Sequence, residues 1–140
     1  MTDPIADRLA VGDVIIKYAT SVDARDMQRY ASCFVEDIVV TGFSGGEMHG
    51  LGPYVEWVVQ ALERFSHTQH LIGNQEIVVT GDSAHMRSYV QATHVLADDD
   101  TVLVILWAVY DDHLVRTPEG WKITKHHLER LIAPRQIKAV

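Results

Sequence analysis

The spacing of the apolar residues in this chain changes at Phe65. Before Phe65 they recur about every three to four positions, the period of an amphipathic helix, and after it they alternate, the period of a strand. The alternating half contains four strand patterns, at 75–80, 83–96, 101–116 and 121–131. Gly81-Asp82 and Thr117-Pro118-Glu119-Gly120 have the composition of tight turns. We therefore expect consecutive strands to pair as antiparallel hairpins.

Helical patterns occupy the first part of the chain. Their predicted limits are Pro4 to Ser21, Asp26 to Phe34 and Pro53 to Phe65. The first helix has a clear start, because Thr2-Asp3-Pro4 combines a capping side chain with a proline in the first turn. A short β-branched strand at 38–41 and a glycine-rich loop separate the second helix from the third. Helices followed by a meandering sheet predict an α+β fold.

The length of the strand patterns predicts the shape of the sheet. Strands of about fourteen residues must twist and curl, and helices on the concave side of a curled sheet enclose a pocket. A chain of 140 residues with 47% hydrophobic residues can bury a genuine core as one domain, residues 1–140. We therefore expect a single domain with three N-terminal helices packed on a strongly curved antiparallel or mixed sheet around a hydrophobic pocket.

Charge and cysteine content exclude several functions. A net charge of −7, with no cluster of Lys or Arg, argues against a nucleic-acid partner. Cys33 is the only cysteine, so an intrachain disulfide and a thiolate metal cage are both excluded; we place it as a packing residue on the second helix. The apolar run 102–109 is too short to span a membrane, and Met1 to Pro4 show no signal sequence, so a cytoplasmic location is expected.

Two of the eight histidines lie in the segment that follows the third helix. In an extended chain His67 and His70 face opposite sides, so they cannot share one metal ion. The chain also lacks a His-Glu-x-x-His motif, and no metal site is predicted. His70, between Gln69 and Leu71, is the histidine that we expect to face the pocket.

A carboxylate partner for His70 is available at the end of the first helix. Asp23 follows the apolar stripe of that helix, and Tyr18, five residues earlier, points in a similar direction. An aspartate in this position is most often a solvated cap. Because the histidine-rich strands can lie opposite, we expect instead that His70 is a catalytic base and that Asp23 orients it.

Three further histidines on the strand patterns are candidates for the pocket. His94 ends a strand face of small and apolar residues, where a structural and a catalytic role both remain open. His126 and His127 are consecutive on a strand, so only one of them can look into the pocket. His126 is the candidate for substrate binding, but the neighbouring residues leave the choice between the two open.

Several segments of the chain resemble one family. They are Tyr18, Val22-Asp23-Ala24-Arg25-Asp26, Phe34-Val35-Glu36-Asp37, Thr68 to Asn74, Gly81 to Ala84, Tyr110 to Arg116 and Gly120 to Ile123. Together they are similar to the SnoaL-like branch of the NTF2-like superfamily, over nearly the whole chain from Ile5 to Leu131. The resemblance implies an NTF2-like cone. Scytalone dehydratase, bile acid dehydratase and hexachlorocyclohexane dehydrochlorinase belong to this branch and use an Asp–His dyad.

The resemblance also implies roles for individual residues. Asp23 and His70 match the dyad, Tyr18 matches a tyrosine that assists in the dehydratases, and His94 matches the second histidine of scytalone dehydratase. Several relatives carry an arginine after the Gly-Trp-x-Ile strand, where this chain departs with His126-His127. The function implied is that of a cofactor-independent lyase or dehydratase acting on a small apolar, possibly cyclic, hydroxy or carbonyl substrate.

Other functions occur in the same branch. They are a polyketide-cyclase-like or isomerase activity, a non-catalytic ligand-binding module, and the small subunit of an aromatic-ring dioxygenase. We also expect self-association, because the strand from Thr101 to Val109 is apolar on both faces. Relatives form dimers and trimers, and the resemblance to the dehydratases favours a homotrimer.

Overall fold

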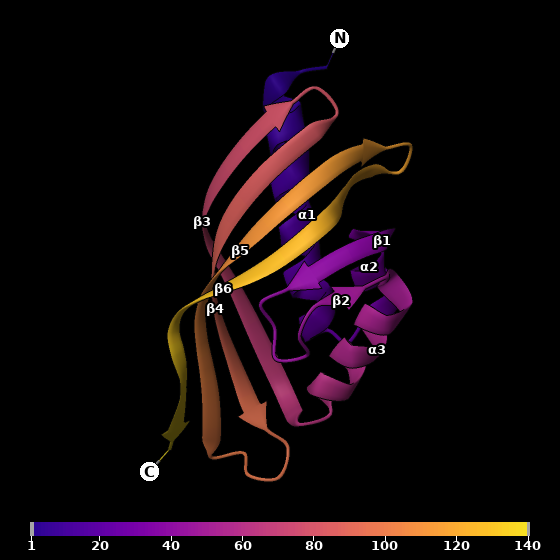
Figure 1. Cartoon of the computed structure of the whole chain (residues 1–140). Coiled ribbons are helices and arrows are strands. Elements are labelled where there is room, and N and C mark those ends of the chain that lie inside the picture. The colour runs from indigo at the N-terminus through magenta and orange to yellow at the C-terminus, as the bar shows by residue number, and fades with distance from the viewer. Residues whose placement is uncertain (1, 140) are drawn as a thin grey trace.

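The computed structural model describes residues 2–139. Its helices are α1 (Pro4–Asp23), α2 (Met27–Ala31) and α3 (Leu51–Leu62). Its strands are β1 (Phe34–Thr41), β2 (Met48–His49), β3 (Phe65–Thr80), β4 (Ser83–Leu96), β5 (Val102–Thr117) and β6 (Gly120–Lys138). Figure 1 shows the strands in one twisted sheet with the helices gathered on one side of it.

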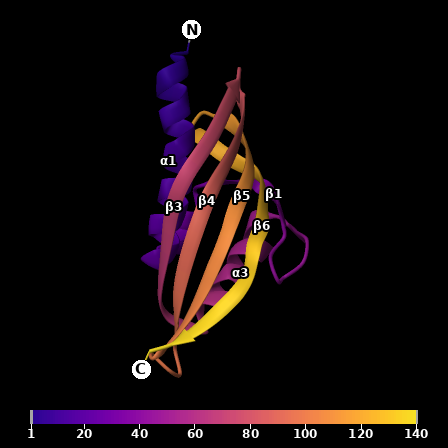
Figure 2. The same ribbon diagram turned by 90° about the vertical axis from the view of Figure 1, so that its left-hand side faces the viewer.

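The sheet has the strand order β2-β1-β6-β5-β4-β3. The last four strands form an antiparallel meander, and β1 joins the edge of β6 in parallel. Strands of this length accumulate twist and bend, and Figure 2 shows them curving around the helices. The sheet is not closed, since β2 and β3 remain as edges. The predicted α+β class, with three helices on a strongly curved mixed sheet, is confirmed.

Specific contacts fix α1 across the sheet. The helix begins where predicted, because the Asp3 carboxylate accepts a hydrogen bond from the backbone N–H of Ile5 at 2.9 Å. One turn later, the guanidinium of Arg116 on β5 donates two hydrogen bonds to Asp7, at 2.8 and 2.9 Å. Such bidentate pairs fix orientation as well as distance. At its far end, the last residue of α1, Asp23, contacts Thr68 and His70 near the start of β3.

Two predicted boundaries are wrong for the same physical reason. The second helix does not continue to Phe34: it ends at Ala31, buried Cys33 lies in the turn after it, and Phe34 starts β1. Phe34 pairs with Ile123, whose backbone N–H donates to the carbonyl of Cys33 at 2.8 Å. Likewise β3 begins at Phe65, because the whole segment pairs with β4. In both cases pairing with a distant strand overrides the local pattern.

The core lies between the helices and the concave face of the sheet. Its largest fully buried side chains include four aromatic residues, Tyr30, Phe34, Tyr54 and Tyr110. Burying side chains of this kind contributes roughly 1.5–3 kcal/mol each to folding, before the entropy cost. Within residues 2–139, no helix combines the length and apolar character that a membrane span requires.

Candidate active site

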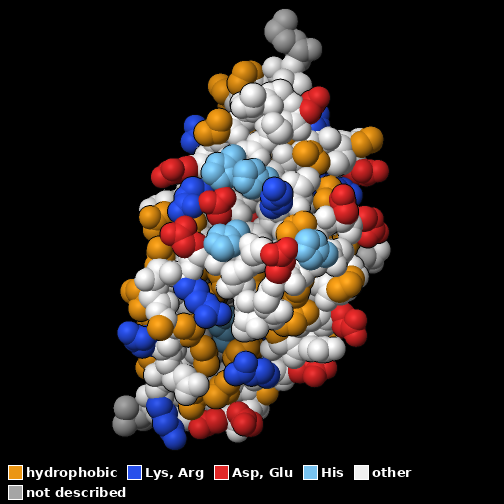
Figure 3. Space-filling model, viewed as in Figure 1, with side chains coloured by type: hydrophobic (Ala, Val, Ile, Leu, Met, Phe, Trp, Pro, Cys, Tyr) orange, Lys and Arg blue, Asp and Glu red, His pale blue; other side chains and the backbone are white. Residues whose placement is uncertain are grey.

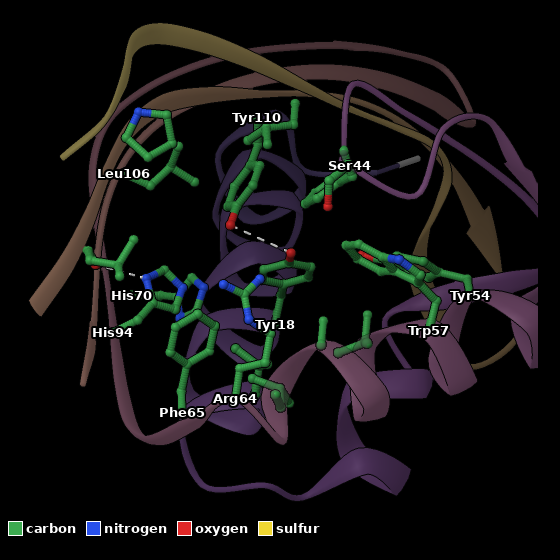
Figure 4. A pocket seen from close by; sticks show the side chains of 18 of the residues that line it. Tyr18, Ser44, Tyr54, Trp57, Arg64, Phe65, His70, His94, Leu106 and Tyr110 are labelled. Carbon is green, nitrogen blue, oxygen red and sulfur yellow. Dashed lines mark hydrogen bonds between the residues drawn. The ribbon is translucent and has the colours of Figure 1, made fainter. Parts of the chain in front are cut away.

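A pocket of about 230 Å³ opens between α1, α3 and the inner face of the long strands. Figure 4 shows its walls, in which aromatic and aliphatic side chains predominate. The aromatic lining residues are Tyr18, Tyr30, Phe43, Tyr54, Trp57, Phe65 and Tyr110. The volume is somewhat below the range of about 300 Å³ and above that ligand pockets in proteins usually occupy. The pocket therefore has room for a small, largely apolar molecule.

Asp23 and His70 meet at one wall of this pocket. Asp23 is the last residue of α1, and His70 lies on β3 with its side chain turned inward. The imidazole Nδ1 is 2.7 Å from Asp23 Oδ1. The other carboxylate oxygen, Oδ2, accepts from the backbone N–H of His70 at 2.8 Å. The same residue is thus held by its ring and by its backbone, which fixes the direction of the imidazole.

Further hydrogen bonds keep the Asp23 carboxylate ionised. Thr68, on the same face of β3, donates its hydroxyl to Oδ1 at 2.9 Å. Burial would raise the pKa of Asp23, but the hydrogen bonds from His70 and Thr68 outweigh it and leave the pKa below the ordinary value. A carboxylate accepts only from a protonated nitrogen, so Nδ1 of His70 carries a proton and Nε2 is free to act as a base.

The turn after α1 carries backbone strain at this site. Arg25 adopts φ of 60°, in the left-handed region that non-glycine residues seldom occupy. Its guanidinium donates to the carbonyl of Val22 at 2.9 Å and to Thr68 Oγ1 at 2.7 Å. These bonds offset the strain and tie the turn to β3. Arg25 therefore holds the Thr68 hydroxyl, which in turn donates to the Asp23 carboxylate.

His94 lies beside His70 on the pocket wall. Its Nδ1 donates to the carbonyl of Val104 at 3.1 Å, and its ring centroid is 5.6 Å from that of His70 and 4.7 Å from that of Phe65. Burial lowers the pKa of His94, and the nearby His70 lowers it further. The neutral ring with Nδ1 protonated leaves Nε2 as an acceptor. His94 is thus hydrogen-bonded to the backbone and also lines the pocket.

Tyr18 lies at the base of the pocket, where its hydroxyl donates to that of Tyr110 at 3.5 Å (Figure 4). Its ring centroid is 6.5 Å from that of His70. Burial raises the pKa of Tyr18 well above the ordinary value, so its hydroxyl stays neutral and can donate a hydrogen bond. Three of the predicted site residues therefore line one pocket, namely Tyr18, His70 and His94. Asp23 does not line it but is hydrogen-bonded to His70.

His126 does not line this pocket, contrary to the prediction of a direct role in substrate binding. Its side chain is 0% exposed and lies behind Tyr18, with Nδ1 2.5 Å from Asp112 Oδ1. His127 faces the outside of the sheet and contacts Thr41 Oγ1 at 2.7 Å. Of the two consecutive histidines, His126 is thus the inward one, but it is separated from the pocket by a tyrosine.

Two cationic residues that the sequence patterns did not indicate also line the pocket. Arg64 follows α3 and Arg130 lies on β6, and both side chains are exposed. Figure 4 shows the Arg64 guanidinium extending over the pocket in front of Tyr18. Neither arginine has an ion-pair partner within residues 2–139. The alternation of β6 does not reveal Arg130 as a pocket residue, because the strand is exposed along this part.

One group of side chains in the described part of the chain has the spacing of metal ligands. It comprises His85, Asp111 and His113 on the outer face of the sheet, where Figure 3 shows histidines among charged side chains. Asp111 already contacts His85 Nε2 at 2.7 Å and Arg87 Nη1 at 2.5 Å, and Arg87 also contacts Glu129 at 2.9 Å. Because Arg87 balances the charge of Asp111, an ion-pair network explains this group.

Comparison with known proteins agrees with the architecture. The model of the SnoaL-like domain matches residues 3–127. An uncharacterized protein of Mycobacterium tuberculosis is 30% identical over 86% of this chain and 83% of its own length.

Solved structures of other proteins have the same fold. A Novosphingobium aromaticivorans protein provisionally assigned as an aromatic ring hydroxylase is 30% identical, with a TM-score of 0.88 and coverage of 97% of this chain and 96% of that one. The hexachlorocyclohexane dehydrochlorinase LinA-type3 from Novosphingobium barchaimii is 21% identical, with a TM-score of 0.84 and coverage of 97% and 93%. This second likeness concerns the fold alone. The chain belongs to the SnoaL-like domain family and shares its fold with a protein of the NTF2-like family.

Proposed function

We propose that this protein is a cofactor-independent enzyme of the lyase or dehydratase type, in which an Asp23–His70 dyad removes a proton from carbon. The observation that carries the proposal is the 2.7 Å contact between Asp23 Oδ1 and His70 Nδ1 at the wall of an apolar pocket. An imidazole held in this way presents an unprotonated Nε2, which is the form that a general base requires.

The site supplies both a base and an acid for an elimination reaction. His70 Nε2 takes a proton from a carbon next to a carbonyl or ring, and the electron pair of that C–H bond forms a carbon–carbon double bond. The hydroxyl on the neighbouring carbon leaves with a proton from an acid and becomes water. Asp23 stabilises the imidazolium that forms, because it stays ionised in this environment.

Tyr18 is better suited than His94 to supply the acidic proton. The Tyr18 hydroxyl is neutral, and it donates its proton to the Tyr110 hydroxyl at 3.5 Å, the longest of the hydrogen bonds at this site. Neutral His94 has already committed its one N–H to the carbonyl of Val104. We therefore assign Tyr18 to the leaving group or developing oxyanion, and His94 to accepting a hydrogen bond from a substrate hydroxyl.

The pocket favours a small apolar substrate with one polarised end. Its aromatic walls suit a cyclic molecule, and its volume of about 230 Å³ excludes a large one. Arg64 and Arg130 add two guanidinium groups at the pocket, and such groups recognise carboxylates and other anionic oxygens. We infer a hydroxy or carbonyl compound that presents such an oxygen to these arginines.

Isomerisation or cyclisation is the second candidate activity. The same base can return its proton to a different carbon, and the phenol of Tyr18 can stabilise an enolate without any leaving group. The two activities differ in their products. In D2O an isomerase introduces deuterium into a product of otherwise unchanged composition, whereas a dehydratase product has lost one molecule of water.

The test uses a panel of small cyclic β-hydroxy ketones with and without a carboxylate. Elimination gives a conjugated enone, which is followed by its ultraviolet absorbance. We expect His70→Ala and Asp23→Asn each to reduce turnover by at least about 100-fold, in the range that general base catalysis contributes. His67→Ala is the matched control, because His67 is exposed on the same strand. Near-normal rates in both dyad variants would overturn the proposal, and ligand binding without turnover would favour a non-catalytic module.

We also infer that the chain forms a homo-oligomer, with a trimer favoured over a dimer. Support comes from large hydrophobic side chains on β4 and β6 that remain exposed in the isolated chain, namely Tyr89 at 46%, Leu131 at 48% and Ile132 at 47%. Exposed apolar surface of this kind commonly marks an interface. Light scattering coupled to size-exclusion chromatography measures the mass directly, and a monomer at micromolar concentration would refute this inference.

A further inference from the structure

A second Asp–His pair lies deeper in the fold than the first. Asp112 on β5 and His126 on β6 are direct neighbours in the register of the two strands, and both side chains are 0% exposed. Oδ1 of Asp112 is 2.5 Å from Nδ1 of His126. The other oxygen, Oδ2, has no hydrogen-bond partner within the described residues 2–139. This pair is therefore connected to its surroundings mainly through the second nitrogen of the imidazole.

That second nitrogen contacts the pocket tyrosine. His126 Nε2 is 3.3 Å from the Tyr18 hydroxyl, and the two ring centroids are 5.1 Å apart. Tyr18 lines the pocket and His126 does not. One series of contacts thus runs from Asp112 through His126 to Tyr18, and the other runs from Asp23 to His70. The first ends at the pocket with a phenol, and the second ends there with an imidazole.

The burial of the second pair determines where its protons lie. Around His126 the structure places aromatic rings, those of Tyr18, Phe34, Phe43, Tyr54 and Tyr110, at centroid distances of 4.8 to 6.3 Å. Among the described residues, neither Asp112 nor His126 forms a second ion pair that could balance a net charge there. An isolated buried charge costs several kcal/mol, so the pair must be neutral as a whole.

Neutrality requires two protons on the pair. One proton is shared along the contact between Asp112 Oδ1 and His126 Nδ1. The second belongs on Nε2, because Nε2 has a partner in Tyr18 whereas Asp112 Oδ2 has none within the described chain. His126 Nε2 is then a donor to the Tyr18 oxygen. The hydroxyl hydrogen of Tyr18 consequently cannot point at His126. It points to the pocket side, where the hydroxyl of the pocket residue Tyr110 accepts it at 3.5 Å and a substrate oxygen can replace that acceptor.

We propose that the buried Asp112–His126 pair is a positioning pair that directs the Tyr18 hydroxyl hydrogen into the pocket and replaces it after transfer. This rests on the proposed function, because Tyr18 acts there as the acid. When Tyr18 gives its proton to the departing hydroxyl, His126 Nε2 gives its own proton to the Tyr18 oxygen. The pair is then left with one proton and a net charge of −1, opposite in sign to the imidazolium that has formed at His70. After product release, solvent restores one proton here and removes one from His70.

The contrast between the two pairs follows from their surroundings. The Asp23 carboxylate is 23% exposed and accepts hydrogen bonds from His70 and Thr68, so it can remain ionised beside a neutral imidazole. Within residues 2–139 the Asp112 carboxylate has one hydrogen-bond partner, and its side chain is 0% exposed. The same two residue types therefore give a base on one side of the pocket and support an acid on the other, as pairs of titratable groups in different environments do.

The first test needs no substrate. Nitrogen-15 NMR of histidine-labelled protein distinguishes protonated from unprotonated ring nitrogens, and His126→Gln and His70→Gln assign the signals. We expect a protonated Nε2 in His126 and an unprotonated Nε2 in His70 at neutral pH. An unprotonated Nε2 in His126 would overturn the proposal, whether or not the protein has the activity proposed above.

The second test separates positioning from structure. Asp112→Asn combined with His126→Gln keeps the pair neutral and polar, but removes the ability to pass on a proton. Circular dichroism and thermal unfolding establish that this double variant is folded. We expect kcat to fall by about 10- to 100-fold with KM little changed, as for loss of part of an acid–base contribution. Unchanged kcat in the folded double variant would show a merely structural role and refute the proposal.

Discussion

Replacement of Asp23 by asparagine tests the dyad with the smallest change of shape. Asp23 accepts three hydrogen bonds, from His70 Nδ1, from the His70 backbone N–H and from Thr68 Oγ1. Asparagine keeps one acceptor oxygen and replaces the other with an amide that donates. Because Oδ2 faces a fixed backbone N–H, the oxygen of asparagine must stay there. Its amide then faces His70 Nδ1.

Two donors cannot face each other, so the imidazole must change tautomer. Nδ1 becomes the acceptor of the amide hydrogen, and the ring proton moves to Nε2. The nitrogen that faces the pocket is then no longer a base. General acid–base catalysis contributes about 10²- to 10⁴-fold, and the loss of the correct tautomer should remove most of it. The stability cost should be only about 1–3 kcal/mol, because one charged hydrogen-bond partner is replaced and the site is partly exposed.

The assay measures kcat and KM on the same hydroxy ketone, with urea unfolding of each variant alongside. Asp26→Asn is the matched control, since Asp26 is exposed and caps α2 three residues further on. The control should lose little in either measurement, because asparagine is also a good N-cap. A kcat for Asp23→Asn within about threefold of the wild type would refute the tautomer argument.

Three further predictions follow from individual contacts. The pKa of Asp23 is lowered in the folded protein from 3.8. The ionised carboxylate therefore contributes to the free energy of unfolding above that pH, and this contribution is lost as the pH falls through the folded pKa. The acid unfolding curves of wild type and Asp23→Asn should converge at low pH. Arg64→Gln should weaken binding of benzoate by only about two- to fivefold, because an exposed charge pair contributes little, and should leave binding of benzamide unchanged. Calorimetry measures both affinities, and Arg8→Gln, at another exposed arginine, is the control. Tyr54→Phe should lower the free energy of urea unfolding by about 1–3 kcal/mol, because it leaves the buried Tyr30 hydroxyl without its partner at 2.7 Å; no measurable loss would contradict this.

Local signals in the sequence were sufficient for much of the site. Asp23 follows the apolar stripe of α1, and alternation puts His67 and His70 on opposite faces. The neighbouring residues and the family resemblance favoured His70 as the inward one. What alternation could not show is that Thr68 and Arg25 reinforce the carboxylate, because the two segments meet only in the folded chain. Arg64 gave no signal either, since a charged residue after a helix is ordinarily solvated.

The clearest division between sequence and tertiary structure is at His126 and His127. Alternation requires that only one of them face inward, and this follows from the sequence alone. Which one it is depends on an irregularity in the pairing of β5 with β6: His113 lies opposite Lys125, but Leu114 lies opposite Ile123. The extra residue in β6 reverses the phase of alternation after buried Ile123, so that His126 is buried and His127 is exposed.

The same irregularity sets Asp112 opposite His126 and so creates the second pair. A strand sequence specifies which residues share a face, because side chains alternate along any extended chain. It does not specify which residue of another strand stands opposite, because register depends on bulges and on packing against the helices. The sequence therefore indicated a helical and a strand half of the chain and named Asp23 and His70 as candidates. The contacts behind Tyr18 depend on strand register, so they follow only from the folded chain.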